Sequence, residues 1–140
     1  MKTIESWHEV VKRRDFSLLT AILADDVVFY SPVVHTPQIG KEITFIYLKA
    51  AAEVFNSPTF SYTNELISGN KASLEFKLEL EGIEINGLDL ITWNDDHKIV
   101  EFKVFIRPLK GVQIIHSMMA EILKEFNKSI LKYPLPSAFL

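Results

Sequence analysis

The stretch from 84 to 107 restricts the fold more than any other part of the sequence. It contains two runs rich in β-branched and aromatic residues, 84–93 and 98–107, separated by a polar turn at 94–97, and this pattern predicts two antiparallel strands. Because a strand alternates its faces, Asp89 shares a side with Ile91 and Trp93, and both faces of the strand are largely apolar. A carboxylate buried there costs several kcal/mol unless it is hydrogen-bonded, paired or protonated. Asp89 is therefore the first candidate for function.

The overall composition limits the class of protein. A chain of 140 residues has the length of one domain, long enough to bury a single core. The formal net charge of -3, with scattered Lys and Arg, disfavours nucleic acid as a partner. The sequence has no cysteine, which excludes disulfides and thiolate chemistry and fits a cytoplasmic location. No apolar run is long enough to predict a membrane span.

The first half of the chain reads as helices with a short strand between them. Apolar residues at helical spacing predict a helix over 3–14 and a shorter one over 16–23, which Asp15 caps. A brief β-branched and aromatic run at 27–30 predicts a strand that ends at a proline. An irregular loop at 33–40 precedes a third helix over 41–55.

The second half reads as strands followed by a helix. Runs at 60–67 and 72–80 predict two strands before the central pair, and apolar spacing predicts a C-terminal helix over 111–131. Segregated elements of this kind are typical of an α+β domain, here with three N-terminal helices on the inner face of a curved antiparallel sheet. We therefore expect one domain over 1–131 and a short tail over 132–140.

Three segments resemble the NTF2-like superfamily, which includes nuclear transport factor 2, SnoaL-type polyketide cyclases and ketosteroid isomerases. They are ILADDVVFYSP, IGKEITFIYLKAAAEVF and INGLDLITWNDDHKIVEFKVFIRP. The resemblance covers nearly the whole chain and implies a cone-shaped α+β barrel that pairs as a homodimer through its sheet. The superfamily contains both enzymes and noncatalytic binding proteins, so the fold alone does not define an activity.

The ketosteroid isomerase pattern is only partly present. That chemistry uses a carboxylate base together with a tyrosine and a protonated aspartic acid that hold an oxyanion. Asp89 falls on the position of the protonated acid, whereas Ser31 stands where the pattern has the base and Trp7 where it has the tyrosine. A serine hydroxyl does not replace a carboxylate base unaided. This departure disfavours steroid isomerisation.

The candidate site residues combine an acid–base pair with residues that contact a substrate. Asp89 is the predicted proton donor or acceptor, and His35, in the loop, is a second candidate for acid–base work; the alternatives are a structural carboxylate and a solvated histidine. Residues expected to contact substrate are Tyr30, Tyr47, Trp7, Ser31 and Trp93, although the two tyrosines also suit core positions with a polar tip. Histidine and glycine spacing predicts no metal site and no nucleotide or other cofactor.

Two functions follow from these residues. The first is a cofactor-independent enzyme that performs acid–base isomerisation, cyclisation or dehydration on a small apolar molecule in the cone pocket. The alternative is a noncatalytic module for small-molecule binding or dimerisation. They differ in what neutralising Asp89 does, because only the enzyme would lose turnover.

Overall fold

The computed structural model describes residues 2–130, with side chains up to residue 126. The predicted domain boundary at 131 and the tail over 132–140 lie outside these residues.

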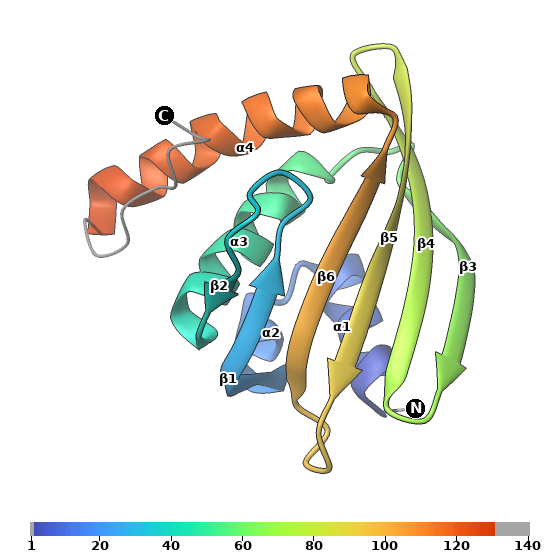
Figure 1. The fold of residues 1–140 in the computed structure, drawn as a ribbon, viewed down its shortest axis with the longest axis vertical. Coiled ribbons are helices and arrows are strands. Elements are labelled where there is room, and N and C mark those ends of the chain that lie inside the picture. Colours follow the sequence, from blue (N-terminus) through green and yellow to red (C-terminus); the bar gives the residue numbers. More distant parts are fainter. Residues whose placement is uncertain (1, 131–140) are drawn as a thin grey trace.

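The described chain contains four helices and one six-stranded sheet (Figure 1). In chain order the elements are α1 (Lys2–Arg13), α2 (Phe16–Ile22), β1 (Leu23–Tyr30), β2 (Gln38–Ile39), α3 (Lys41–Val54), β3 (Ser61–Ser68), β4 (Lys71–Leu80), β5 (Ile83–Trp93), β6 (Ile99–Arg107) and α4 (Leu109–Ile130). The strand order across the sheet is β2-β1-β6-β5-β4-β3. The predicted α+β class, with helices before and after a run of hairpin-linked strands, is confirmed.

The sheet is mixed and open, which corrects the expectation of an antiparallel barrel. Strands β3 to β6 pair antiparallel, but β1 pairs parallel with β6. Strands joined by a short turn must be antiparallel, whereas β1 and β6 are separated by α3 and three other strands, so their relative direction is set by the crossover. The sheet curves but does not close, because β2 and β3 remain as its edges (Figure 1).

The concave face of the sheet carries the core. The predicted alternation of β5 is confirmed, since Ile85, Asp89, Ile91 and Trp93 are all buried whereas the residues between them are more accessible. Helices α1, α2 and α3 lie over this face, and α4 packs on α3 and on the end of β6 (Figure 1). The helices and the curved sheet therefore enclose the side of β5 from which Asp89 projects.

An extra residue in β3 decides which of its side chains face inward. Tyr62 is opposite Phe76, but Asn64 is opposite Glu75, so Thr63 forms a bulge. After the bulge Glu65 lies opposite the buried Leu74. Because paired residues share a face, both Tyr62 and Glu65 point toward α1.

Gly87 allows a close approach between two strands. It lies opposite Phe76, and a Cβ at Gly87 would be 2.3 Å from Cζ of the Phe76 ring and 2.8 Å from the carbonyl oxygen of Phe105. Both separations are shorter than a Cβ atom tolerates, so the ring of Phe76 occupies the space that a side chain at position 87 would need. This placement gives the inner face of the sheet an aromatic wall.

We expect Gly87→Ala to destabilise the fold by about 1–3 kcal/mol, the usual cost of overpacking, because both the Phe76 ring and the β6 backbone must move. Urea unfolding measures the loss. Glu84→Ala, at an exposed position of the same strand, is the matched control and should stay within about 0.5 kcal/mol of the wild type. Equal stability of Gly87→Ala and the control would show that Phe76 does not depend on this contact.

Candidate active site

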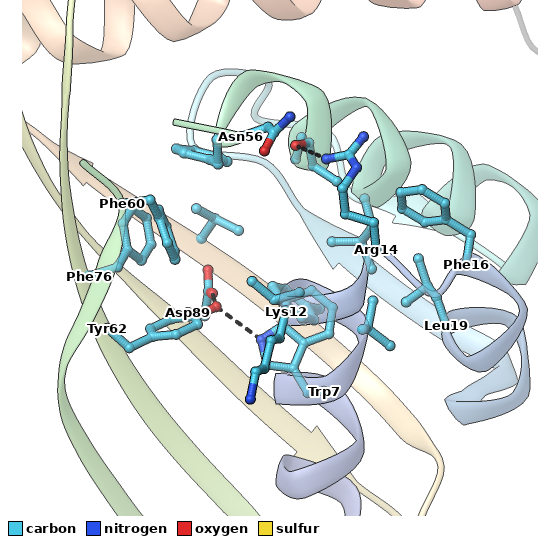
Figure 2. A pocket seen from close by; sticks show the side chains of 18 of the residues that line it. Trp7, Lys12, Arg14, Phe16, Leu19, Asn56, Phe60, Tyr62, Phe76 and Asp89 are labelled. Atoms are coloured by element: carbon cyan, nitrogen blue, oxygen red, sulfur yellow. Dashed lines mark hydrogen bonds between the residues drawn. The ribbon is translucent and has the colours of Figure 1, made fainter. Parts of the chain in front are cut away.

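A cavity of about 290 Å³ lies between the helices and the inner face of the sheet (Figure 2). Its volume is at the lower end of the range for small-molecule pockets. Much of its wall is aromatic, with Trp7 from α1, Phe55 and Phe60 from the α3–β3 connection, Phe76 from β4 and Phe102 from β6. The rings of Phe60 and Phe76 stack with centroids 5.4 Å apart. Such walls suit a compact apolar molecule.

Asp89 is the only carboxylate among the described residues that line this cavity. Its side chain is directed into the cavity from β5 (Figure 2), and the residue is 6% exposed. Burial raises the pKa of Asp89 from 3.8 to about 7, and a hydrogen bond from Tyr62 partly offsets that rise. At neutral pH the protonated and the ionised forms are therefore both populated, as suits a group that gives and takes protons.

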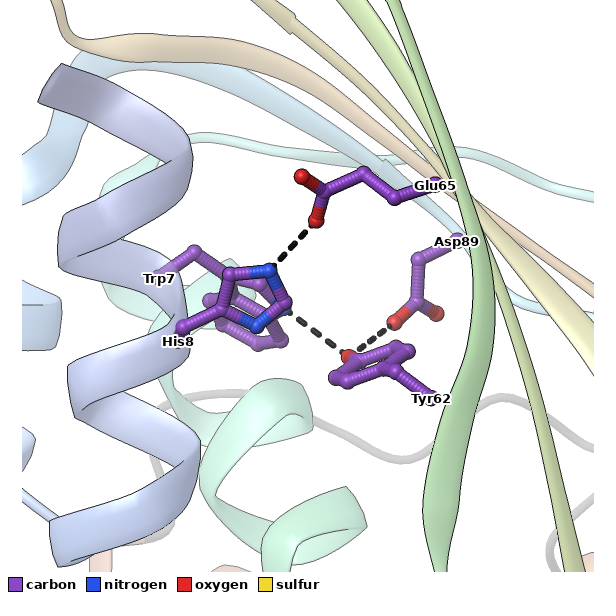
Figure 3. Close-up of polar contacts among 5 residues, drawn as sticks. All are labelled: Trp7, His8, Tyr62, Glu65 and Asp89. Atoms are coloured by element: carbon purple, nitrogen blue, oxygen red, sulfur yellow. Dashed lines mark hydrogen bonds and ion pairs between the residues drawn. The ribbon is translucent and has the colours of Figure 1, made fainter. Parts of the chain in front are cut away.

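A chain of two hydrogen bonds fixes the orientation of this carboxyl group (Figure 3). Trp7 Nε1 donates to the Tyr62 hydroxyl oxygen at 2.9 Å, and the Tyr62 hydroxyl donates to Asp89 Oδ2 at 2.7 Å. An indole N–H can only donate, so the tyrosine hydrogen has to point toward Asp89. Oδ2 of Asp89 is thereby occupied as an acceptor, which leaves Oδ1 as the oxygen that can exchange a proton with a ligand.

Tyr62 acts in this chain as a donor and not as a base. Burial, and then the neighbouring Asp89, raise its pKa well above the ordinary value. The phenol is therefore protonated across the physiological range. Tyr62 positions Asp89 and lowers its pKa without ionising itself.

A second polar contact joins the same two elements near the surface (Figure 3). His8 Nε2 lies 2.6 Å from Glu65 Oε1, and the His8 ring packs edge-on against Tyr62 at 5.3 Å between centroids. Both partners are partly exposed. Trp7 and His8 together fasten α1 to the edge strand β3.

The structure brings together two of the seven site residues named from sequence, Trp7 and Asp89, which both line the cavity. The others lie outside its lining. Tyr47 is buried on α3 against Phe29, at 5.6 Å between ring centroids, and burial raises its pKa to about 12. Trp93 is buried near the end of β5, where its backbone N–H donates to the Asn70 carbonyl.

Tyr30, Ser31 and His35 lie at the end of β1 and in the loop that follows. Because β1 runs parallel to β6, this loop is carried to the end of the sheet near α4, away from α1 (Figure 1). The Ser31 hydroxyl accepts from the backbone N–H groups of Val33 and Val34, and His35 is exposed. Ser31 therefore shapes a turn in this structure.

Tyr62 is the residue that sequence reasoning missed. Its strand was predicted, but its contact with Asp89 depends on the bulge at Thr63 and on the register between β3, β4 and β5. The available signal was a tyrosine in a strand close in sequence to the strand of a buried acid, whose carboxyl needs a donor.

Within residues 2–130, no three His, Asp or Glu side chains gather as a metal site would require. In the same part of the chain, no helix is long and apolar enough to cross a membrane.

The curved sheet, the covering helices and the enclosed acid define an α+β domain with a ligand-sized cavity. The family model of the SnoaL-like domain matches residues 4–102. The chain therefore belongs to the SnoaL-like domain family, and the NTF2-like superfamily resemblance is confirmed.

Solved structures agree with this assignment. A steroid delta-isomerase from Pseudomonas aeruginosa is 34% identical, with a TM-score of 0.84 over 90% of this chain and 92% of that one. An uncharacterized protein with a cystatin-like fold from Silicibacter pomeroyi is 32% identical, with a TM-score of 0.84 over 94% and 92%. An NTF2-like protein from Mesorhizobium loti, 18% identical with a TM-score of 0.66 over 76% and 89%, shares the fold. No curated protein matched the sequence.

We expect Asp89→Asn to become more stable than the wild type as the pH rises. In the unfolded chain the carboxyl ionises near pH 3.8, whereas in the folded chain it keeps its proton up to about pH 7. Between these values the unfolded state gains stability by ionising, so the wild type loses up to about 4 kcal/mol. The asparagine amide cannot ionise, and its oxygen still accepts from Tyr62. Urea unfolding at pH 4, 6 and 8 measures the difference, and a pH-independent difference would contradict a buried, shifted Asp89.

Proposed function

We propose that this protein is a cofactor-independent acid–base enzyme that isomerises, cyclises or dehydrates a small, largely apolar molecule. The observation that carries the proposal is the position of Asp89 at the wall of an apolar cavity, with one oxygen held by Tyr62 at 2.7 Å and a pKa raised to about 7. A buried carboxyl group tuned to neutral pH is typical of a catalytic proton carrier.

A single carboxyl group is sufficient for all three reactions. In an isomerisation the carboxylate takes a proton from a carbon beside a carbonyl group and returns it to another carbon. In a dehydration it takes the carbon-bound proton and delivers it to the leaving hydroxyl, which departs as water. In an aldol-type cyclisation the proton goes to the new alkoxide. In each case Asp89 ends in the state in which it began, so no second acid or base is needed.

The Pseudomonas aeruginosa relative supports proton transfer as the reaction class, because it is described as a steroid delta-isomerase. Two observations separate this chain from steroid chemistry. Ser31, at the position where the resemblance has a base, lies outside the cavity lining, and Trp7 stands in place of the tyrosine. Trp7 also gives its only hydrogen to Tyr62. We therefore propose a substrate other than a steroid.

We expect Asp89→Asn to lower turnover by about 10²–10⁴-fold, the usual contribution of a general acid–base group. A suitable first probe is the conversion of cyclohex-3-enone to the conjugated cyclohex-2-enone, followed by ultraviolet absorbance, and NMR detection of deuterium uptake by small cyclic ketones extends it. The matched control is Asp26→Asn, an exposed acid on β1. Unchanged turnover in Asp89→Asn would exclude Asp89 as the proton carrier.

Tyr62→Phe distinguishes positioning from proton transfer in the same assay. The change keeps the ring but removes the hydrogen bond that lowers the pKa of Asp89. The midpoint of the pH–rate profile, near 7 in the wild type, should therefore move upward. A lower rate with an unmoved midpoint would mean that Tyr62 does not tune Asp89.

A noncatalytic binding module is the second candidate function. It is favoured by one observation, that no second carboxylate or histidine is among the described residues lining the cavity. For such a module, Asp89→Asn changes only ligand affinity or stability, and no probe ketone exchanges its protons faster than in buffer.

We also propose a homodimer formed through the outer face of the sheet, in a cytoplasmic protein, as the cysteine-free sequence suggests. Phe105 is 52% exposed beside Leu88, and Leu66 is 65% exposed on the same face. Burying apolar residues of this size stabilises protein pairs.

Accordingly, we expect Phe105→Glu to convert the dimer to a monomer, because it places a charge where an exposed aromatic ring would be buried between the two subunits. Light scattering at micromolar concentration measures the mass. Ile39→Glu, at a position 75% exposed on β2, is the control and should leave the dimer intact. A wild-type monomer would rule out this proposal.

A further inference from the structure

The lining of the cavity shows where it opens. Most lining residues are buried or half-buried, but Lys12, near the end of α1, and Asn56, just after α3, are exposed. The opening therefore lies between the end of α1 and the α3–β3 connection. Figure 2 shows Arg14 and Asn56 on the side of the cavity away from Tyr62 and Asp89.

The cavity lining contains two cations and one carboxyl group. Lys12 lies in the last turn of α1 and Arg14 just after it, and Figure 2 shows Arg14 on the side away from Asp89, which lies beside Tyr62. The opening is thus positively charged, although the whole chain has a formal net charge of -3. An anion entering here meets positive charge first, and Asp89 beyond it adds no repulsion while it is protonated.

Lys12 and Arg14 differ in whether a carboxylate already pairs with their positive charge. Arg14 donates to the Ala52 carbonyl oxygen at 3.1 Å and to Glu53 Oε1 at 2.9 Å, which holds its guanidinium group in place at the end of α3. Among residues 2–130, Lys12 has no carboxylate in ion-pair contact. The opening therefore carries about one uncompensated positive charge.

We propose that the substrate is a small monocarboxylate, with its carboxylate at the opening beside Lys12 and Arg14 and its apolar part against the aromatic wall. This inference rests on the proposed function, because it places the reacting atoms at Asp89. A singly charged group matches the single uncompensated cation, and a compact ring or short chain matches a cavity of about 290 Å³. The positive opening selects an acid over its neutral ester.

Calorimetric titration with matched pairs tests the selection. The probes are 4-phenylbutanoate, cyclohexylacetate and 3-oxocyclohexanecarboxylate, each against its methyl ester, at pH 6 and low salt. We expect each acid to bind about threefold to tenfold more tightly than its ester, as partly exposed charge pairs allow, and the preference to shrink in 0.5 M salt as screening increases. An equal or tighter affinity for the esters, or no binding of any acid, would overturn the proposal.

Lys12→Gln tests whether the preference for the acid over its ester arises at Lys12. Because Lys12 is exposed and unpaired within the described chain, this change should leave the fold intact, lower acid affinity about threefold and leave ester affinity unchanged. Lys110→Gln, at an exposed position of α4, is the matched control and should change neither. An equal loss in both variants would mean that the selection reflects overall charge, and would contradict a site at Lys12.

These titrations measure binding alone, so their outcome is independent of turnover. Acid-selective binding without turnover of any probe above the rate in buffer would retain the ligand class and reject the enzyme. Loss of turnover in Asp89→Asn without acid selectivity would retain the enzyme and reject the carboxylate.

Discussion

The buried carboxyl group of Asp89 is the constraint on which the rest of the site depends. An aspartate that is 6% exposed in an apolar cavity is costly without a partner. Tyr62 supplies that partner from β3, and Trp7 supplies the donor for Tyr62 from α1. Since an indole can only donate, the direction of both hydrogen bonds follows from Trp7. One side chain from each of three elements thus determines which oxygen of the acid remains for chemistry.

Backbone geometry is what allows these three side chains to meet. The bulge at Thr63 turns both Tyr62 and Glu65 toward α1. The missing side chain at Gly87 lets Phe76 lie over β5, so that the wall next to Tyr62 is aromatic and apolar. Burial against this apolar wall raises the pKa of Asp89, and the hydrogen bond from Tyr62 prevents a larger rise. The same two irregularities of the sheet therefore shape the cavity and tune its acid.

The sequence predicts the parts of this structure that depend on local pattern. The β5–β6 hairpin, the burial of Asp89 and the three covering helices follow from periodicity and turn residues. The Tyr62–Asp89 contact joins residues 27 positions apart and depends on a bulge that leaves no mark in composition. The parallel pairing of β1 with β6 likewise depends on a crossover, and it carries Ser31 and His35 away from the cavity. Tyr62, which is placed by register, was therefore missed, whereas Asp89, which is placed by the alternation of its strand, was found.

A site with one carboxyl group imposes a condition that a two-carboxyl site does not. The same group has to take a proton and later return it, so its pKa has to lie near the working pH. Burial alone would keep the acid protonated, and full hydration would keep it ionised. The hydrogen bond from Tyr62 holds the pKa of Asp89 between these limits, because it favours the charged form without supplying a charge of its own. A cation in contact with Asp89 would have lowered its pKa well below neutrality, and in this structure the guanidinium of Arg14 lies on the side of the cavity away from the acid (Figure 2). Keeping Arg14 away from the acid leaves Asp89 able both to take and to return a proton, while the opening still attracts an anion.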